Sequence, residues 1–344
     1  MKENKQANIC KSCSSQMEFD PNSQSLKCVH CGKLDVFDVQ KYSGEKHTFA
    51  IDFDIDKQKV EGKRYLCKSC GRECVFGEEE QEPRCQSCGN KDLQPIKSIE
   101  YKPDGILPFK INEEKAIKCF FDWIKKRKFA PKDLKTLDRA NLFEKVYVPV
   151  FSYDFDVDTS YSGRGVVYSY TRSDGRRVEK KEHFQGSRTD KYNNYLTSAS
   201  SAIPSYTLRS LQPFSNGYYV YSPEFLYGFV ASNIEYSLQD SFRDLTILVK
   251  NEIEKRIKQN QPYTHIESFF CHSSFSNIKY NYLYFPIYKG EYSYRGKKYR
   301  FFVNGENGNV TGNSPRSIWK TILMTIVIAL GAVGLGFLIS LFMR

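Results

Sequence analysis

Apolar and polar residues alternate along most of the chain after residue 146, which is the pattern of half-buried β-strands. Asn304-Gly305 and Asn307-Gly308 fall where hairpin turns need residues that tolerate a positive φ. The expected strands cover Val146–Asp158, Tyr161–Arg172, Thr264–Phe275, Ile278–Tyr294 and Lys297–Val303, with an earlier one inside His47–Asp56.

Two segments instead repeat apolar residues every three or four positions, the spacing of an amphipathic helix. In Glu113–Lys128 the apolar face includes Phe120 and Ile124, and the segment opens with acidic residues and closes with basic ones, as a helix dipole favours. A second helix is expected from about Ser237 to Gln259, whereas residues 186–216 are typical of a long loop with one short helix. Strands, a helix and further hairpins predict an α+β body with an antiparallel sheet.

The C-terminal segment is apolar without interruption from Thr321 to Met343. At about 1.5 Å per residue this length crosses a hydrocarbon layer of about 30 Å. Arg316 and Lys320 precede it, and cytoplasmic flanks are rich in such residues. We therefore expect a single C-terminal transmembrane helix over 318–343 in the bacterial inner membrane, with the N-terminal bulk in the cytoplasm. A small-residue face could pair with another membrane helix, so a homo-oligomer stays open; it comprises Gly331, Ala332, Gly334 and Gly336.

Eight of the 11 cysteines stand in two copies of the pattern C-x2-C-x14-C-x2-C, 57 residues apart. Each doublet can offer two thiolates to one metal ion, and two doublets complete the tetrahedral set that Zn²⁺ prefers. A cytoplasmic location argues against disulfides. The sequence therefore predicts two zinc ribbons, each with one structural Zn²⁺ ion and no open coordination position. The expected ligands are Cys10, Cys13, Cys28 and Cys31 in the first copy, and Cys67, Cys70, Cys85 and Cys88 in the second.

The charge distribution bears on what the ribbons contact. The 344 residues carry a net charge of +11, but residues 1–100 hold 16 Lys and Arg against 17 Asp and Glu, a net charge of −1, so the rest carry +12. Zinc bound by four thiolates adds about −2 at each site. An acidic ribbon region is a poor binder of phosphate groups, which makes nucleic acid an unlikely partner and favours protein contact or a purely structural role.

No motif of an enzyme stands in the sequence: there is no GxxxxGK[ST], HExxH, GxSxG or GxGxxG. Two DFDxD triplets could bind Mg²⁺ or Ca²⁺, but alternation on a strand favours a solvent-facing row of carboxylates. Cys271 and His272 are strand neighbours that point to opposite faces, which disfavours a nucleophile and base pair. The triplets are Asp52, Asp54, Asp56 and Asp154, Asp156, Asp158.

Residues 279–320 interleave tyrosines and phenylalanines with cations and have a net charge of +6, from eight Lys and Arg against two Glu. Such a stretch could stack single-stranded nucleic acid. Strand alternation favours instead a core on one face, with cations held near anionic lipid on the other.

The order of motifs resembles a family of bacterial zinc-ribbon membrane proteins, often labelled as having a transcription-factor-IIB-type zinc ribbon or as primosomal-helicase-like. Besides the ribbons, the motifs that carry the resemblance are Pro103–Phe109, Trp123–Pro131, Val146–Phe151, Tyr161-Ser-Gly163, Phe285-Pro286, Tyr294–Tyr299 and Val303–Gly312. The resemblance implies a protein of the cytoplasmic membrane that works beside flotillin-like (SPFH-domain) and phage-shock-type partners in the response to envelope stress.

These observations lead to the hypothesis of a non-enzymatic, membrane-anchored adaptor that recruits proteins. The alternative is a membrane-tethered, replication-associated protein that binds nucleic acid. The expected divisions are ribbon 1 at 1–45, a strand linker and ribbon 2 at 46–102, a linker and helix at 103–145, the body at 146–315 and the membrane helix at 318–343.

Overall fold

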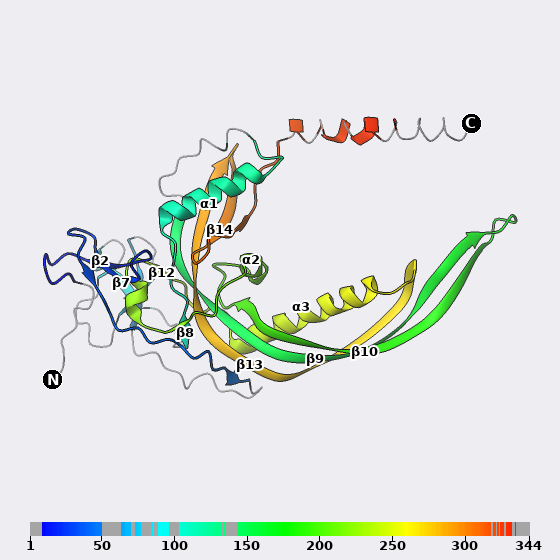
Figure 1. The fold of residues 1–344 in the computed structure, drawn as a ribbon, viewed down its shortest axis with the longest axis horizontal. Helices are drawn as coiled ribbons and strands as arrows, with labels where there is room; N and C mark the ends of the chain where they lie inside the picture. Colours follow the sequence, from blue (N-terminus) through cyan, green and yellow to red (C-terminus); the bar gives the residue numbers. More distant parts are fainter. Residues whose placement is uncertain are drawn as a thin grey trace.

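A long, curved antiparallel sheet dominates the computed structural model, with one helix lying along its concave side (Figure 1). The residues that the structure describes are 9–49, 63–69, 73–76, 84–85, 89–95, 103–131, 134, 143–317, 319–320, 322, 324–326, 328–331 and 334.

Five strands form the path of this sheet in the order β10-β9-β13-β14-β15. At about 3.3 Å per residue, strands as long as β9 and β13 extend for roughly 90 Å along their curved path. Beyond Val166, the last partner of β13, β9 and β10 continue as a two-stranded arm (Figure 1). The bounds are β9 (Phe143–Thr171), β10 (Arg177–Ser198), β13 (His265–Tyr294), β14 (Lys297–Asn304) and β15 (Val310–Gly312).

Short strands extend the sheet at the end away from the arm. Both β4 (His47–Thr48) and β8 (Gly105–Ile106) pair with β13. β12 (Val230–Ala231) pairs with β9, and β11 (Tyr219–Val220) pairs with β8. The segments that precede and follow the second ribbon in the sequence are therefore built into the body.

The expected α+β class is wrong, because the described structure is mostly sheet. Strands predicted as separate, such as Val146–Asp158 and Tyr161–Arg172, form the single strand β9. Likewise, a bulge at Asn277, with φ +53°, lets β13 pass through the polar residues that separate its two predicted halves. Polar breaks in the alternation do not end these strands: in β13 a bulge absorbs the extra residue, and in β9 Thr159 and Ser160 keep the register with β13. The expected loop at 186–216 is also partly strand, because β10 continues to Ser198.

Two long helices pack at different positions along the sheet (Figure 1). Helix α1 (Glu113–Lys126) begins at Asn112, whose side chain accepts a hydrogen bond from the Lys115 amide, and it buries Phe120 against Phe301 with ring centroids 3.8 Å apart. Helix α3 (Leu238–Gln259) begins at a Ser237 cap and buries a row of aliphatic residues over the concave face of the sheet. Shorter helices are α2 (Ser205–Ser210) and the 3₁₀ turn η3 (Pro223–Leu226).

The predicted transmembrane helix is a further correction. Within the part of the chain that the structure describes, no helix is long and apolar enough to cross a membrane. Residues 335–343 of the expected span 318–343 lie outside the described residues, as do several positions before them. An uninterrupted apolar run shows hydrophobicity, but a span also needs about 20 residues in one continuous helix.

Candidate metal centre

The four cysteines of the first ribbon bring their sulfur atoms together. The Sγ atoms of Cys10, Cys13, Cys28 and Cys31 all lie within 4.8 Å of one another. The Cys10–Cys31 and Cys13–Cys28 sulfurs are 3.7 and 3.4 Å apart. Four sulfurs bound at about 2.3 Å to one tetrahedral ion would lie about 3.8 Å apart. The cluster thus has the size of a four-thiolate metal site, as the sequence predicted.

Local backbone geometry holds these thiols in place. Gly32, at φ +71°, donates its amide to the Cys28 carbonyl at 3.1 Å, and the Cys31 amide points at the Cys28 sulfur at 3.4 Å. In the other doublet the Ser12 amide lies 3.5 Å from the Cys10 sulfur. Glycine after a doublet therefore serves the left-handed turn that lets amides face sulfur.

Contacts with nearby groups give the thiols of this cluster different pKa values. Hydrogen bonds from Ser15 lower the pKa of Cys13 to about 6, with a smaller contribution from the Cys28 sulfur. The Lys33 backbone amide favours the Cys31 thiolate, but the neighbouring sulfurs outweigh it and raise the pKa of Cys31 to about 11. Four thiolates this close repel one another, so the arrangement suits a cation at its centre.

The first ribbon is continuous with the core of the body. Cys10 and Cys28 are 2% and 1% exposed and belong to the same buried cluster as Phe109 and Phe225. Ribbon 1 contains the sheet β1 (Met17–Asp20), β2 (Ser25–Cys28) and β3 (Leu34–Asp35), and β1 docks on the segment after η3. A metal at this site would therefore stabilise the core of the body as well as the ribbon.

The described part of the second ribbon repeats the first with the offset of 57 residues seen in the sequence. Gly89, at φ +71°, donates to the Cys85 carbonyl at 2.8 Å, as Gly32 does to Cys28. The ion pair Lys68–Asp92 at 3.7 Å repeats Lys11–Asp35 at 3.8 Å. The strands are β5 (Lys63–Cys67), β6 (Glu73–Phe76) and β7 (Leu93–Pro95).

Half of the predicted second metal site can be placed. Cys67 and Cys85 are buried and pack in one small cluster with Tyr65 and Leu93. Cys70 and Cys88 lie outside the described residues. The first site can thus be judged by its geometry, whereas the second rests on its repeat of the same backbone.

The DFDxD triplets do not form a metal site among the described residues. Asp154 accepts a hydrogen bond from Lys46 Nζ at 2.6 Å, and Asp156 accepts one from the Asn277 amide group at 2.8 Å. Thr189 donates to Asp158 at 2.6 Å. Each carboxylate has its own partner along the face of β9, and the other triplet, residues 52–56, lies outside the described part of the chain.

The aromatic residues of 279–320 lie mainly in the core, but the predicted alternation is wrong for residues 280–288, because both faces of β13 are buried there. Tyr280, Tyr284 and Tyr288 are at most 5% exposed. Beyond this buried stretch, Glu291 pairs with Lys298 at 2.9 Å and with Arg300 at 3.3 Å. The buried rings are therefore unavailable as a stacking platform for nucleic-acid bases.

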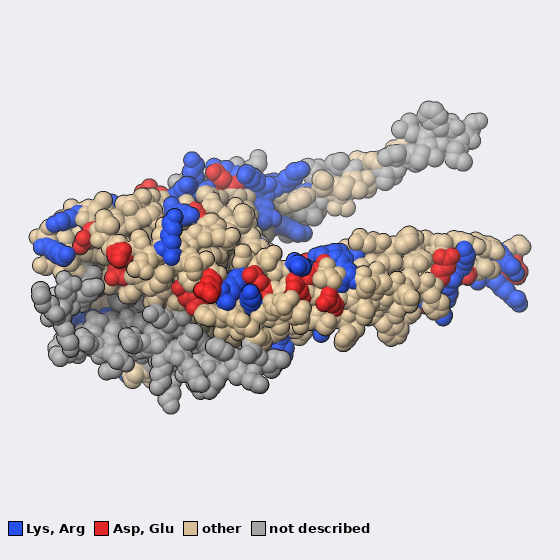
Figure 2. Space-filling view, turned by 60° about the horizontal axis from the view of Figure 1, so that its bottom comes forward, with Lys and Arg blue, Asp and Glu red and all other residues tan. Residues whose placement is uncertain are grey.

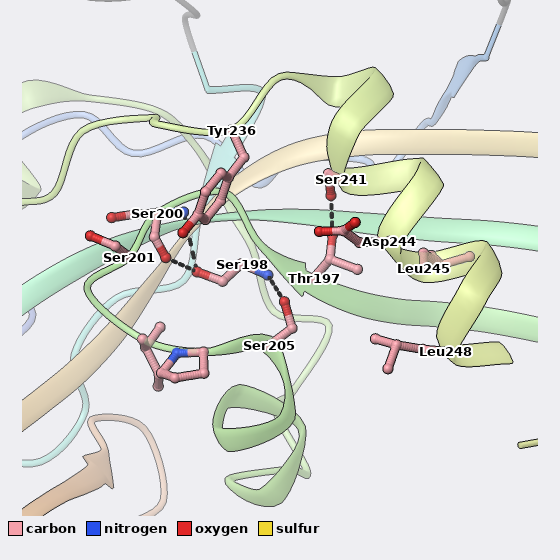
Figure 3. A pocket seen from close by; sticks show the side chains of 12 residues that line it. Thr197, Ser198, Ser200, Ser201, Ser205, Tyr236, Ser241, Asp244, Leu245 and Leu248 are labelled. Atoms are coloured by element: carbon pink, nitrogen blue, oxygen red, sulfur yellow. Dashed lines mark hydrogen bonds between the residues drawn. The ribbon is translucent and has the colours of Figure 1, made fainter. Parts of the chain in front are cut away.

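A pocket that sequence reasoning missed lies where β10 ends and α3 begins (Figure 3). Its volume is about 280 Å³. Within it, the Thr197 and Ser241 hydroxyls are 2.7 Å apart, and the Ser198 amide donates to Ser205 Oγ at 2.9 Å. None of the residues that line it is a histidine, lysine or cysteine. Its carboxylates are Asp244, which lines the pocket, and Glu235, which accepts hydrogen bonds from the Ser200 and Ser201 hydroxyls at 3.2 and 3.0 Å. The signal in the sequence is the serine-rich run around residues 197–205, which the fold brings beside the start of α3.

Comparisons with known proteins place the chain beside one relative. An uncharacterized protein, YdjG of Bacillus subtilis (strain 168), is 27% identical over 317 residues, which cover 90% of this chain and 90% of that protein. No protein-family model and no solved structure matches the chain. The resemblance to the zinc-ribbon membrane family therefore stays a prediction.

Proposed function

We propose that this chain is a zinc-binding, non-enzymatic adaptor that recruits other proteins at the cytoplasmic face of the bacterial inner membrane. The observation that supports this most is the four-sulfur cluster of Cys10, Cys13, Cys28 and Cys31. With four protein ligands, such a site leaves no position for water or substrate, which is the mark of structural rather than catalytic zinc. Because Cys10 and Cys28 belong to the buried core of the body, a metal ion bound by the cluster would stabilise that core.

Two structural Zn²⁺ ions per chain are part of this proposal. Soft thiolates in a tetrahedral arrangement select zinc over harder cations. The second ion would be held by Cys67, Cys70, Cys85 and Cys88, and the repeated turn at Gly89 supports it. Metal analysis of the purified full-length chain is expected to find two zinc ions. A content of one ion or none would contradict this part.

The membrane location is supported by exposed apolar residues next to cations. Trp319, Ile328 and Leu330 are 81, 61 and 67% exposed. At the start of this segment, Lys320 Nζ donates to the Ala130 carbonyl at 2.7 Å, which brings it beside the basic run Lys125–Lys128. Apolar side chains beside a cluster of cations match the surface of an anionic bilayer.

A protein partner fits the surface better than nucleic acid. On the face that Figure 2 shows, basic and acidic side chains stand close together over the sheet, with no continuous basic stripe there. Along the arm, for example, Lys180 pairs with Glu182 at 2.8 Å and Arg177 with Glu179 at 3.0 Å. Paired cations contribute little to phosphate binding. The family resemblance points to flotillin-like (SPFH-domain) and phage-shock-type proteins as the partners.

The test is affinity purification of the full-length chain from gently solubilised membranes, followed by mass spectrometry. We expect enrichment of an SPFH-domain or phage-shock-type protein with the parent chain and with Cys271→Ser, whose cysteine is exposed and outside the cluster. Cys13→Ser should lose that enrichment, because the ribbon loses its metal.

Nucleic-acid binding is measured on the same preparations. Binding of DNA or RNA by the full-length chain at submicromolar concentration and physiological salt, with a steep fall as salt rises, would overturn the adaptor proposal in favour of the alternative. A parent chain that retains no protein of the expected classes would also contradict the adaptor proposal.

A further inference from the structure

The outer edge of β10 has no partner among the described residues. β10 stands at the end of the sheet order, and its inner edge pairs with β9. From Arg177 to Tyr192 it has no extra residue of its own, because the one register shift in this stretch skips Val167 of β9. This leaves a regular strand edge of 16 residues with alternating outward amide and carbonyl groups, which can template another strand.

Charges of both signs line this edge in an order that is self-complementary. Even-numbered residues such as Arg188 and Asp190 share the face of α3, where Arg256 reaches Asp190 at 3.3 Å, and odd-numbered residues such as Thr189 share the other face. The charged positions are Arg177, Glu179, Lys180, Lys181, Glu182, Arg188, Asp190 and Lys191.

We propose that β10 pairs antiparallel with β10 of a second copy of this chain, around a two-fold axis at Gln185. This register places Glu179 opposite Lys191, Lys180 opposite Asp190 and Glu182 opposite Arg188. Symmetry repeats each pair, so six opposite-charge contacts flank the axis and no like charges face each other. Directly opposed side chains of opposite charge stabilise an antiparallel pair of strands.

Neighbouring registers lack this complementarity. A slip of two residues in one direction puts Lys180 opposite Arg188, and the same slip in the other direction puts Glu182 opposite Asp190. A slip of one residue in the first of these two directions puts Glu179 opposite Asp190. On many edge strands, charged side chains simply prevent pairing with other chains. Here they instead select one register, which is what a specific homodimer requires.

The uncharged residues beside the axis also fit. Phe184 of one copy would stand opposite Gly186 of the other, so its ring meets no side chain there. Within one chain these positions are already ordered: an added Cβ at Gly186 would lie 2.5 Å from the Tyr161 hydroxyl, and one at Gly163 would lie 2.6 Å from the Phe184 ring. The edge is thus pre-shaped before a second copy binds.

The first experiment measures dimer dissociation of the full-length chain in mild detergent by analytical ultracentrifugation. Lys191 is suited to charge reversal because it makes no ion pair with a described residue, although it stands opposite Asp156 of β9. We expect Lys191→Glu and Glu179→Lys each to weaken dimerisation about tenfold, since each repels at two symmetric contacts. The double variant should return close to the parent. Lys255→Glu, an exposed reversal on α3, is the control and should leave dimerisation unchanged.

A cysteine cross-link tests the register directly. Only residue 185 faces its own symmetry mate, at a Cα separation of about 5 Å that a disulfide can span. Under mild oxidation Gln185→Cys should form a covalent dimer. Ser187→Cys, exposed on the same face, should not, because its mate lies four residues away along the strand, about 13 Å.

Three outcomes would overturn the proposal. One is a parent chain that stays monomeric at high micromolar concentration. Another is a dimer in which Gln185→Cys forms no more covalent dimer than the parent, which has cysteines of its own. The third is a double reversal that fails to recover dimerisation although each single variant is folded by circular dichroism.

Discussion

The Phe19 amide of the first ribbon donates a hydrogen bond of 2.9 Å to the Tyr227 carbonyl of the body. The Phe19 ring is 2% exposed and lies 5.2 Å, centroid to centroid, from Phe225. Backbone and side chain thus join a small ribbon to a large core. A ribbon fixed in this way is a part of the body rather than a module on a linker.

Removal of the Phe19 ring should therefore weaken the whole protein. We expect Phe19→Ala to lower the free energy of unfolding by about 3–5 kcal/mol, the range for loss of a buried phenylalanine. Thermal denaturation followed by circular dichroism measures this. Phe270→Ala is the matched control, since that ring is 72% exposed. An equal effect of the two changes would contradict the docking of ribbon 1.

Loss of one thiolate should have consequences beyond the metal site. Cys13→Ser is expected to lose one of the two zinc ions and to lower the melting temperature of the body, because Cys10 and Cys28 share the body's buried cluster. Elemental analysis and calorimetry of the same preparation report both effects. Cys271→Ser should keep both ions and the parent's melting temperature.

Lys46 is a buried cation that ties the segment between the ribbons to β9. Its side chain is 8% exposed, and its Nζ donates to Asp154 at 2.6 Å and to Asn194 at 2.8 Å. Burial lowers its pKa, although the Asp154 carboxylate acts in the other direction.

Lys46→Met should cost about 2 kcal/mol of stability, because it leaves the partner oxygens without a donor. Denaturant titration gives the value. Lys41→Met, exposed on the same segment, should cost little, and equal losses would show that the buried contacts of Lys46 do not stabilise the fold.

Glu306 should make stability depend on pH. Burial alone would raise its pKa, but hydrogen bonds from Lys110 and Ser215 outweigh it and hold the pKa below the ordinary value of 4.5. The folded state therefore binds this proton less readily than the unfolded chain. The stabilisation is complete above about pH 4.5 and is lost as the pH falls through the folded pKa.

Glu306→Gln should accordingly be less stable than the parent by about 1 kcal/mol at pH 7, and the gap should narrow towards pH 3. Unfolding curves over this range measure it. Glu114→Gln, exposed on α1, serves as the control. A gap that stays constant with pH would exclude this role for Glu306.

The Tyr263 ring leaves no room for a side chain at Gly165. A Cβ added there would lie 2.2 Å from the Tyr263 ring, which itself stacks on Phe184 at a centroid distance of 5.2 Å. Gly165→Ala should cost about 1–3 kcal/mol in the parent. In a Tyr263→Ala background the same change should cost much less, so a double-mutant cycle of unfolding free energies isolates the contact. Additive costs would refute it.

The sequence alone determined the features that depend on neighbours along the chain. The CxxC spacing predicted the four-sulfur cluster at Cys10–Cys31, because a doublet and its following glycine close a local turn. Helix α1 was expected from its 3.6-residue period and its charged ends, and it ends two residues before the predicted Lys128. Local hydrogen bonds and periodic burial suffice for such elements.

Tertiary structure decided what depends on contacts between distant segments. Whether a polar break ends a strand depends on the strand beside it: Thr159 and Ser160 stay paired within β9, and a bulge carries β13 past Asn277, so each of these strands was predicted as two. The α+β class and the transmembrane helix were wrong for a related reason: composition states how apolar a segment is, but not how long a continuous element it forms. Ribbon 1 joins the core because Phe19 packs against Phe225. The outer edge of β10 is open because no described strand follows β10 in the sheet. No pattern of neighbouring residues in the sequence predicts either of these two features.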